Sequence, residues 1–105
     1  MVPLNKWTSP EFTEALLVWT AYGRDAMPRR DDASVVSRFG SEAASELLPQ
    51  IRSLVDEFYL SDAKLTAVDL GEMARVAIEE FKAKHPEVAD EVLKALAWCY
   101  TFDFR

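Results

Sequence analysis

Residues 9–22 read SPEFTEALLVWTAY, and this stretch decides the fold class. It opens with Ser9, a typical N-cap, and with Pro10, which suits the first position of a helix. In its second half the only polar side chains are the Thr20 hydroxyl and the tip of Tyr22. Because a helix that is apolar on all sides is buried on all sides, we expect residues 10–22 to form a central, buried helix.

The composition of the whole chain favours one helical domain. A chain of 105 residues can bury a single core, and 50% hydrophobic with 29% charged residues is typical of a globular protein. Only three glycines occur, and neither an Asn-Gly nor an Asp-Gly pair marks a hairpin, which argues against an all-β fold. We therefore predict an all-α fold, in which residues 1–105 form a single compact bundle of about five helices.

Apolar residues at helical spacing predict the remaining helices. The expected helices cover residues 10–22, 32–39, 42–59, 67–84 and 86–99, and the second of them is short. Pro49 interrupts the third helix, since it cannot donate to the carbonyl of Ser45. The apolar stripe keeps its phase across this proline, so we prefer one bent helix, and two separate helices are the alternative. The order of the helices in space stays open.

Two further predictions concern the last helix. We expect His85 to cap its start. After Cys99, the side chains of Tyr100, Phe102 and Phe104 alternate with smaller or polar residues, and a period of two is typical of a strand rather than a helix. We interpret the end of the chain as a tail that leaves the helix and places its aromatic side chains across the bundle.

The sequence holds no pattern that predicts catalysis, a metal site or a cofactor. His85 and Cys99 are the only residues of their kinds, and fourteen positions of one helix would separate them by about 21 Å, too far for a Cys-His pair. Metal-ligand spacings, glycine-rich phosphate loops and nucleophile elbows do not occur. We expect a protein that is not an enzyme, although a pocket built from carboxylates of different helices would leave no trace in the sequence.

Cysteine usage and the length of the apolar runs bear on location. One cysteine provides no disulfide framework, and no charged and then apolar leader follows Met1. The longest apolar run has about eight residues, whereas a helix that spans a bilayer needs about 20. We expect a cytoplasmic protein without a membrane partner.

The net charge of −6 is unevenly distributed. Residues 1–40 contain five basic and five acidic side chains, so residues 41–105, with seven basic and thirteen acidic side chains, carry the whole excess. Such a surface repels nucleic-acid phosphates and attracts basic partners. The positive charge of the loop with Arg24, Arg29 and Arg30 is nearly cancelled by neighbouring aspartates. We interpret this stretch as a self-paired surface loop, and an anion or nucleic-acid contact is the alternative.

A large aromatic side chain in the acidic part of the chain leads to the first hypothesis on function. Tyr59 is the expected exposed anchor, and the residues expected to bind a partner are Asp56, Glu57, Tyr59, Asp62, Asp69 and Glu72. An acidic helical surface with a central aromatic anchor gives fast association and a desolvated hot spot. In composition and size the chain resembles small bacterial immunity proteins that block basic nuclease toxins. That resemblance implies a non-catalytic protein-binding module that neutralises a basic protein partner.

A second hypothesis belongs to a different class of function. In this hypothesis the chain is a self-associating structural or regulatory module. It forms a homodimer that buries the aromatic tail or part of the long apolar stripes. Because salt does not screen apolar contacts as it screens charges, such a dimer would survive high salt. In this hypothesis, deletion of residues 101–105 yields monomers.

Overall fold

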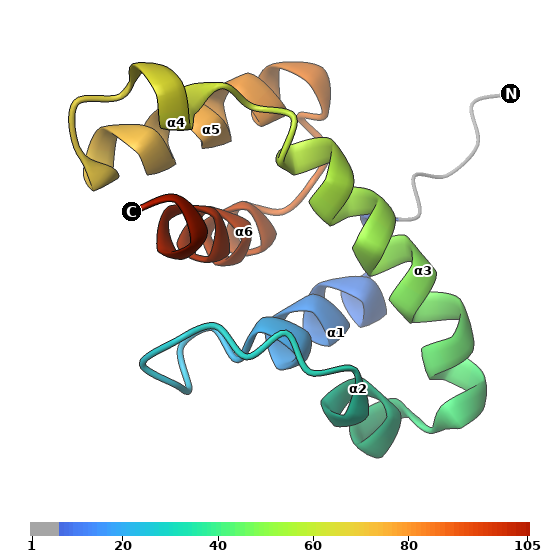
Figure 1. Ribbon diagram of the computed structural model, residues 1–105. Helices are drawn as coiled ribbons and strands as arrows, with labels where there is room; N and C mark the ends of the chain where they lie inside the picture. Colours follow the sequence, from blue (N-terminus) through green and yellow to red (C-terminus); the bar gives the residue numbers. More distant parts are fainter. Residues whose placement is uncertain (1–6) are drawn as a thin grey trace, which may run out of the picture.

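The structure, a computed structural model, describes residues 7–105, and all regular structure within this range is helical (Figure 1). The helices are α1 (Pro10–Thr20), α2 (Asp32–Phe39), α3 (Ser41–Phe58), α4 (Ala63–Thr66), α5 (Leu70–Lys84) and α6 (Asp90–Phe104). The prediction of an all-α fold is confirmed. Five longer helices lie close to the expected positions, and α4 adds one short turn in a segment expected to be a connection. Residues 1–6 of the expected domain lie outside the described range.

α1 begins as its residues predict and ends slightly earlier. The Ser9 side chain accepts a hydrogen bond from the Phe12 amide at 3.0 Å, and Pro10 occupies the first position. The helix ends at Thr20 because Ala21 adopts a left-handed conformation with a φ of 63°. The buried hydroxyl of Thr20 donates to the Leu16 carbonyl at 3.0 Å, so this polar group is satisfied inside the core.

α3 runs through Pro49 as one bent helix, which confirms the preferred alternative (Figure 1). The proline itself is exposed. The buried residues on both sides of it are Ala44, Leu47, Ile51, Leu54 and Phe58. The helix tolerates the lost hydrogen bond because this stripe holds both of its halves against the same core.

α6 shares the centre of the fold with α1. It lies between α1 and α5 and packs against both (Figure 1). The buried residues of α6 are Val92, Leu93, Ala95, Leu96, Ala97, Cys99 and Tyr100. The buried apolar residues of α1 are Phe12, Ala15, Leu16 and Trp19, while Leu17 and Val18 on its other side are half-buried. The two helices together therefore supply a large part of the core.

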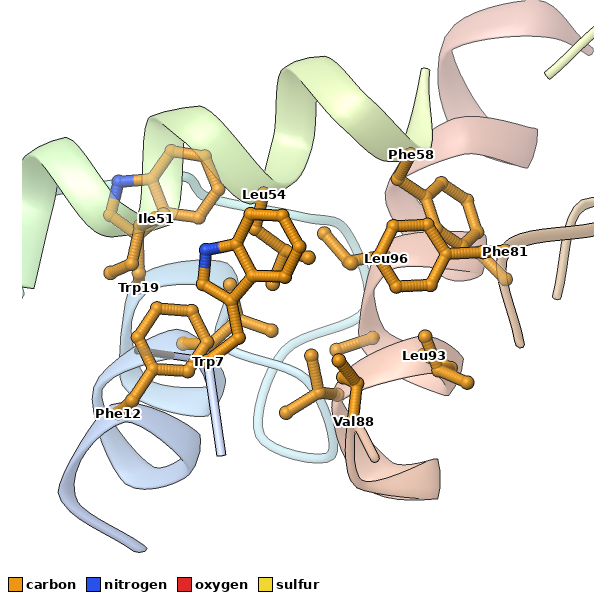
Figure 2. Packing of buried hydrophobic residues seen from close by; sticks show 14 of the residues in the cluster. Trp7, Phe12, Trp19, Ile51, Leu54, Phe58, Phe81, Val88, Leu93 and Leu96 are labelled. Atoms are coloured by element: carbon orange, nitrogen blue, oxygen red, sulfur yellow. The ribbon is translucent and has the colours of Figure 1, made fainter. Parts of the chain in front are cut away.

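Aromatic side chains join α3, α5 and α6 in this core. The centroid of the Phe58 ring lies 5.5 Å from that of Phe81 and 6.0 Å from that of Tyr100. Figure 2 shows the Phe58 and Phe81 rings together, with Leu96 of α6 in the same cluster. Since each such ring buries about 150 to 250 Å² of surface, this cluster fixes the C-terminal end of α3 against its neighbours.

The prediction of an extended C-terminal tail is wrong, because α6 continues to Phe104. Residues that alternate over five positions also fall at i and i+4, where helical side chains meet. Tyr100 and Phe104 form one such pair, with ring centroids 4.9 Å apart. Trp98 and Phe102 form the other, and both line one shallow groove. The aromatic pattern that suggested a strand thus fits a helix equally well.

The last two long helices begin a few residues later than expected. α5 begins at Leu70 rather than residue 67, because Asp69 caps it by accepting from the Glu72 amide at 2.8 Å. α6 begins at Asp90 rather than residue 86. His85 ends α5, where its amide donates to the Phe81 carbonyl at 2.8 Å, and does not cap α6. Residues 86–89 instead form a turn that brings Val88 into the core.

Candidate functional site

The six residues expected to bind a partner fall into two groups on the surface. Asp56 and Glu57 belong to the last turn of α3, whereas Asp69 and Glu72 lie at the start of α5. Glu57 lines a groove with Glu80, in the C-terminal half of α5. Along the axis of α5, Glu80 lies about 12 Å from Glu72. The α3 group and the α5 group are therefore separate.

Asp69 and Glu72 have local structural roles. Asp69 is the N-cap of α5, and Glu72 accepts from the Val68 amide at 3.0 Å. Glu72 also pairs with Arg75, one turn later, at 3.6 Å. Reciprocal bonds of this kind satisfy backbone donors that the first turn of a helix leaves free. Both carboxylates thus stabilise the start of α5.

Tyr59 is not the exposed anchor that the sequence suggested. The side chain is half-buried, and its ring packs 5.3 Å from Tyr100 and 5.9 Å from Phe104, between centroids. Its hydroxyl donates to Asp103 at 2.7 Å. Burial and this hydrogen bond raise the pKa of Tyr59 far above its ordinary value. The hydroxyl therefore stays protonated and bound to α6.

Asp103 is the centre of a small polar network that closes the fold. Arg30 donates to both of its carboxylate oxygens, at 2.6 and 2.9 Å. Partial burial would raise the pKa of Asp103, but the hydrogen bonds from Arg30 and Tyr59 hold it below the ordinary value. Since the carboxylate stays ionised, the network ties the α1–α2 loop and the end of α3 to the last turn of α6.

Leu60 is the exposed apolar side chain beside the acidic group, and it is not among the residues predicted to bind a partner. It is 66% exposed, directly after the end of α3, and it lines the same groove as Glu57 and Glu80. Asp62 follows it in the connection to α4 and is also exposed. The exposure of Leu60 could have been predicted from its position, because residue 60 lies outside the helical spacing of the apolar stripe that buries Phe58.

An acidic surface, with two carboxylates near the start of α3 and two near its end, lies on one side of this helix. We call it the α3 acidic face and define it by Glu42, Glu46, Asp56 and Glu57. At 3.6 residues per turn, these four side chains fall within a sector of about 100° and span about 22 Å of the helix. Three of them are exposed, and Glu57 is half-buried. The predicted residues Asp56 and Glu57 are thus one end of a longer surface.

Cations elsewhere in the fold do not neutralise this face. Within residues 7–105, none of its four carboxylates forms a salt bridge. The basic residues that do form salt bridges to other carboxylates are Arg29, Arg30, Arg38, Arg52, Arg75 and Lys82. The negative charge of this face is therefore available to a partner.

The described residues offer little for covalent or metal chemistry. Burial raises the pKa of the Cys99 thiol to about 12, so that the reactive thiolate is scarce at neutral pH. In residues 7–105 no group of three or more His, Cys, Asp or Glu side chains could hold a metal ion. No helix in that range combines the length and the apolar character needed to cross a membrane.

Comparisons with protein-family models, with curated proteins and with solved structures find no match. The function of the α3 acidic face therefore has to be argued from its geometry and charge.

Proposed function

We propose that this chain is a non-catalytic, acidic protein-binding module that binds a basic protein, as a small inhibitor or immunity-type protein would. The observation that carries the proposal is the α3 acidic face, whose four carboxylates have no cationic partner within residues 7–105. In this proposal the protein is cytoplasmic and binds neither nucleic acid nor a membrane.

The layout of this surface fits the two stages of protein association. Carboxylates along about 22 Å of helix attract a positive surface over a distance and orient it, which raises the association rate by about 10- to 1,000-fold at low salt. Leu60 lies at one end of the α3 acidic face and is 66% exposed. It supplies an apolar contact that is desolvated when the partner binds. The partner would be inhibited because the acidic face covers its cationic site.

The first prediction concerns the carboxylates at the Leu60 end of the face. A protein with Asp56→Asn and Glu57→Gln keeps the shape of both side chains but loses two negative charges. We expect its affinity for the basic partner to fall about tenfold at low salt, because steering and charged contacts are lost together. The partner is isolated from a lysate of the native host on immobilised protein, identified by mass, and then titrated in purified form.

The control for this prediction removes the same charge elsewhere. Glu11 and Glu91 are exposed and, within residues 7–105, form no salt bridge. Glu11→Gln with Glu91→Gln should bind the partner about as tightly as the original protein. Equal losses in the two double variants would mean that only net charge matters, and the assignment to α3 would be wrong.

A second candidate function is self-association, and one surface favours it. Leu65 of α4 is 75% exposed and Val68, directly after α4, is 84% exposed. Leu70 and Met27 are also exposed, and they line one groove together with Phe102 of α6. Apolar side chains that gather on a surface in this way are typical of protein interfaces. The surface that would be buried in a homodimer is thus the α4–α5 connection.

The second prediction tests this alternative. If the chain is a homodimer, replacement of Leu65 and Val68 by serine should give monomers, because the dimer loses its most exposed apolar contacts. Sedimentation equilibrium in low and high salt measures the mass. Leu60→Ser is the control and should leave the dimer intact. A wild-type protein that is monomeric at high micromolar concentration would exclude the homodimer.

The deletion of residues 101–105 that the sequence suggested is a poor test of self-association. It removes Asp103, which holds Arg30 and Tyr59 in place. A loss of dimers would then report damage to the fold as readily as damage to an interface. The double serine variant avoids this ambiguity because both side chains are exposed.

A further inference from the structure

The arginines of the α1–α2 loop separate in the structure. Arg30 donates a hydrogen bond to Asp103 of α6, whereas Arg24 and Arg29 line an open groove together with Arg38 of α2. From the sequence alone we expect a self-paired loop without a connection to Arg38, which lies fourteen positions after Arg24. The fold therefore brings arginines from the α1–α2 loop and from α2 to one groove.

The groove retains many free hydrogen-bond donors. Within residues 7–105, the Arg24 side chain makes neither a salt bridge nor a hydrogen bond. Arg29 uses only Nη1, which donates to Asp25 at 3.0 Å. Arg38 uses Nε and Nη2, and both contact Glu14. Since a guanidinium carries five N–H groups, every one of these arginines has donors left.

The charge of the groove favours a negatively charged ligand. Three guanidinium groups face two carboxylates, Asp25 and Glu14, so one positive charge is left over. The hydrogen bond from Arg29 lowers the pKa of Asp25, which therefore stays ionised and competes with a ligand. The planar fork of a guanidinium matches the oxygens of a phosphate group, which accept two parallel hydrogen bonds.

The remaining lining of the groove has an apolar part. Val18 of α1 and Ala21, the C-cap of α1, lie beside the arginines. Ser37 adds a hydroxyl that makes no hydrogen bond within residues 7–105. An inorganic anion would leave the apolar part unused. We propose that this groove binds a phosphate monoester, with the phosphate on Arg24 and Arg38 and its organic group against Val18.

This site is separate from the proposed function. The groove involves α1, the α1–α2 loop and α2, and none of its residues belongs to the α3 acidic face. A variant at Arg24 can therefore lose the phosphate ligand while it keeps the basic partner. The reverse holds for Asp56→Asn with Glu57→Gln.

The third prediction uses two substitutions with opposite expected effects. Phenyl phosphate is added to ¹⁵N-labelled protein at constant ionic strength, and backbone amide shifts are followed by NMR. Arg24→Ala should raise the Kd about tenfold, because it removes the free guanidinium. Asp25→Asn should lower the Kd, because it removes the competing charge. It also keeps the side-chain oxygen that accepts from the Ala26 amide at 2.7 Å.

Controls decide whether the groove is the site and what it selects. Arg75 on α5 has the same side-chain exposure as Arg38, 57%, and Arg75→Ala should leave the Kd unchanged. Inorganic phosphate should bind more weakly than phenyl phosphate. Equal affinity of the two would overturn the assignment to a monoester. Shifts outside the groove, the absence of saturation at millimolar concentrations, or an equal loss in Arg75→Ala would overturn the site.

Discussion

Replacement of Phe58 by alanine is expected to lower the free energy of unfolding by about 4 kcal/mol. The ring is 1% exposed and packs against Phe81 of α5 and Tyr100 of α6. Its removal leaves a cavity at the point where three helices meet, and the rigid neighbours cannot fill it. Urea denaturation followed by circular dichroism measures the change.

A milder variant covers the case in which the alanine protein does not fold. Phe58→Leu keeps most of the apolar volume and should cost clearly less than the alanine variant. Leu65→Ala is the surface control, because Leu65 is 75% exposed, and it should change stability by no more than about 0.5 kcal/mol. If Phe58→Ala were no more costly than Leu65→Ala, the described core would be wrong.

The second large effect is expected for Tyr100→Phe, at about 2 kcal/mol. The Tyr100 hydroxyl is buried, donates to the Ser61 carbonyl at 2.8 Å and accepts from the Lys64 amide at 3.0 Å. Phenylalanine keeps the ring but removes both hydrogen bonds. The loss falls on the first turn of α4, so amide hydrogen exchange at Lys64 and Leu65 should accelerate together with the drop in global stability.

Tyr59→Phe is the matched control because it makes the same chemical change on the neighbouring ring. The hydroxyl of the half-buried Tyr59 donates to the exposed Asp103, and Asp103 keeps both hydrogen bonds from Arg30. We expect a cost of only about 0.5 kcal/mol. A larger cost for Tyr59→Phe than for Tyr100→Phe would show that the Asp103 network, and not the α4 contact, holds this end of the molecule.

Both predictions bear on the proposed binding surface. Phe58 anchors the last turn of α3 in the core, and Tyr100 holds the segment that follows Leu60. The acidic side chains at this end of α3 therefore project from a fixed backbone. A surface that is rigid before binding loses less entropy when the partner docks, which favours affinity.

Part of the candidate site could be predicted from residue types alone. Asp56 and Glu57 follow an apolar stripe that must face inward, so their place on the outside of α3 was predictable. The pairing of charges could not be predicted, because Arg30 binds Asp103, which is 73 positions away in the sequence, and Arg52 binds Asp32, which is 20 positions away. Which carboxylates remain without a cation depends on these long-range contacts.

The sequence by itself determined the helical class and the cap at Ser9, and it favoured one helix through Pro49 over two, since these follow from local hydrogen bonding and from the phase of one apolar stripe. The tertiary structure alone decided that Tyr59 is tied to Asp103, that Leu60 is exposed, and that Arg24 and Arg38 share a groove. The physical reason is the sequence distance over which each interaction acts. A cap or an apolar stripe depends on residues within a few turns of one helix, whereas burial and charge pairing depend on which helices pack together.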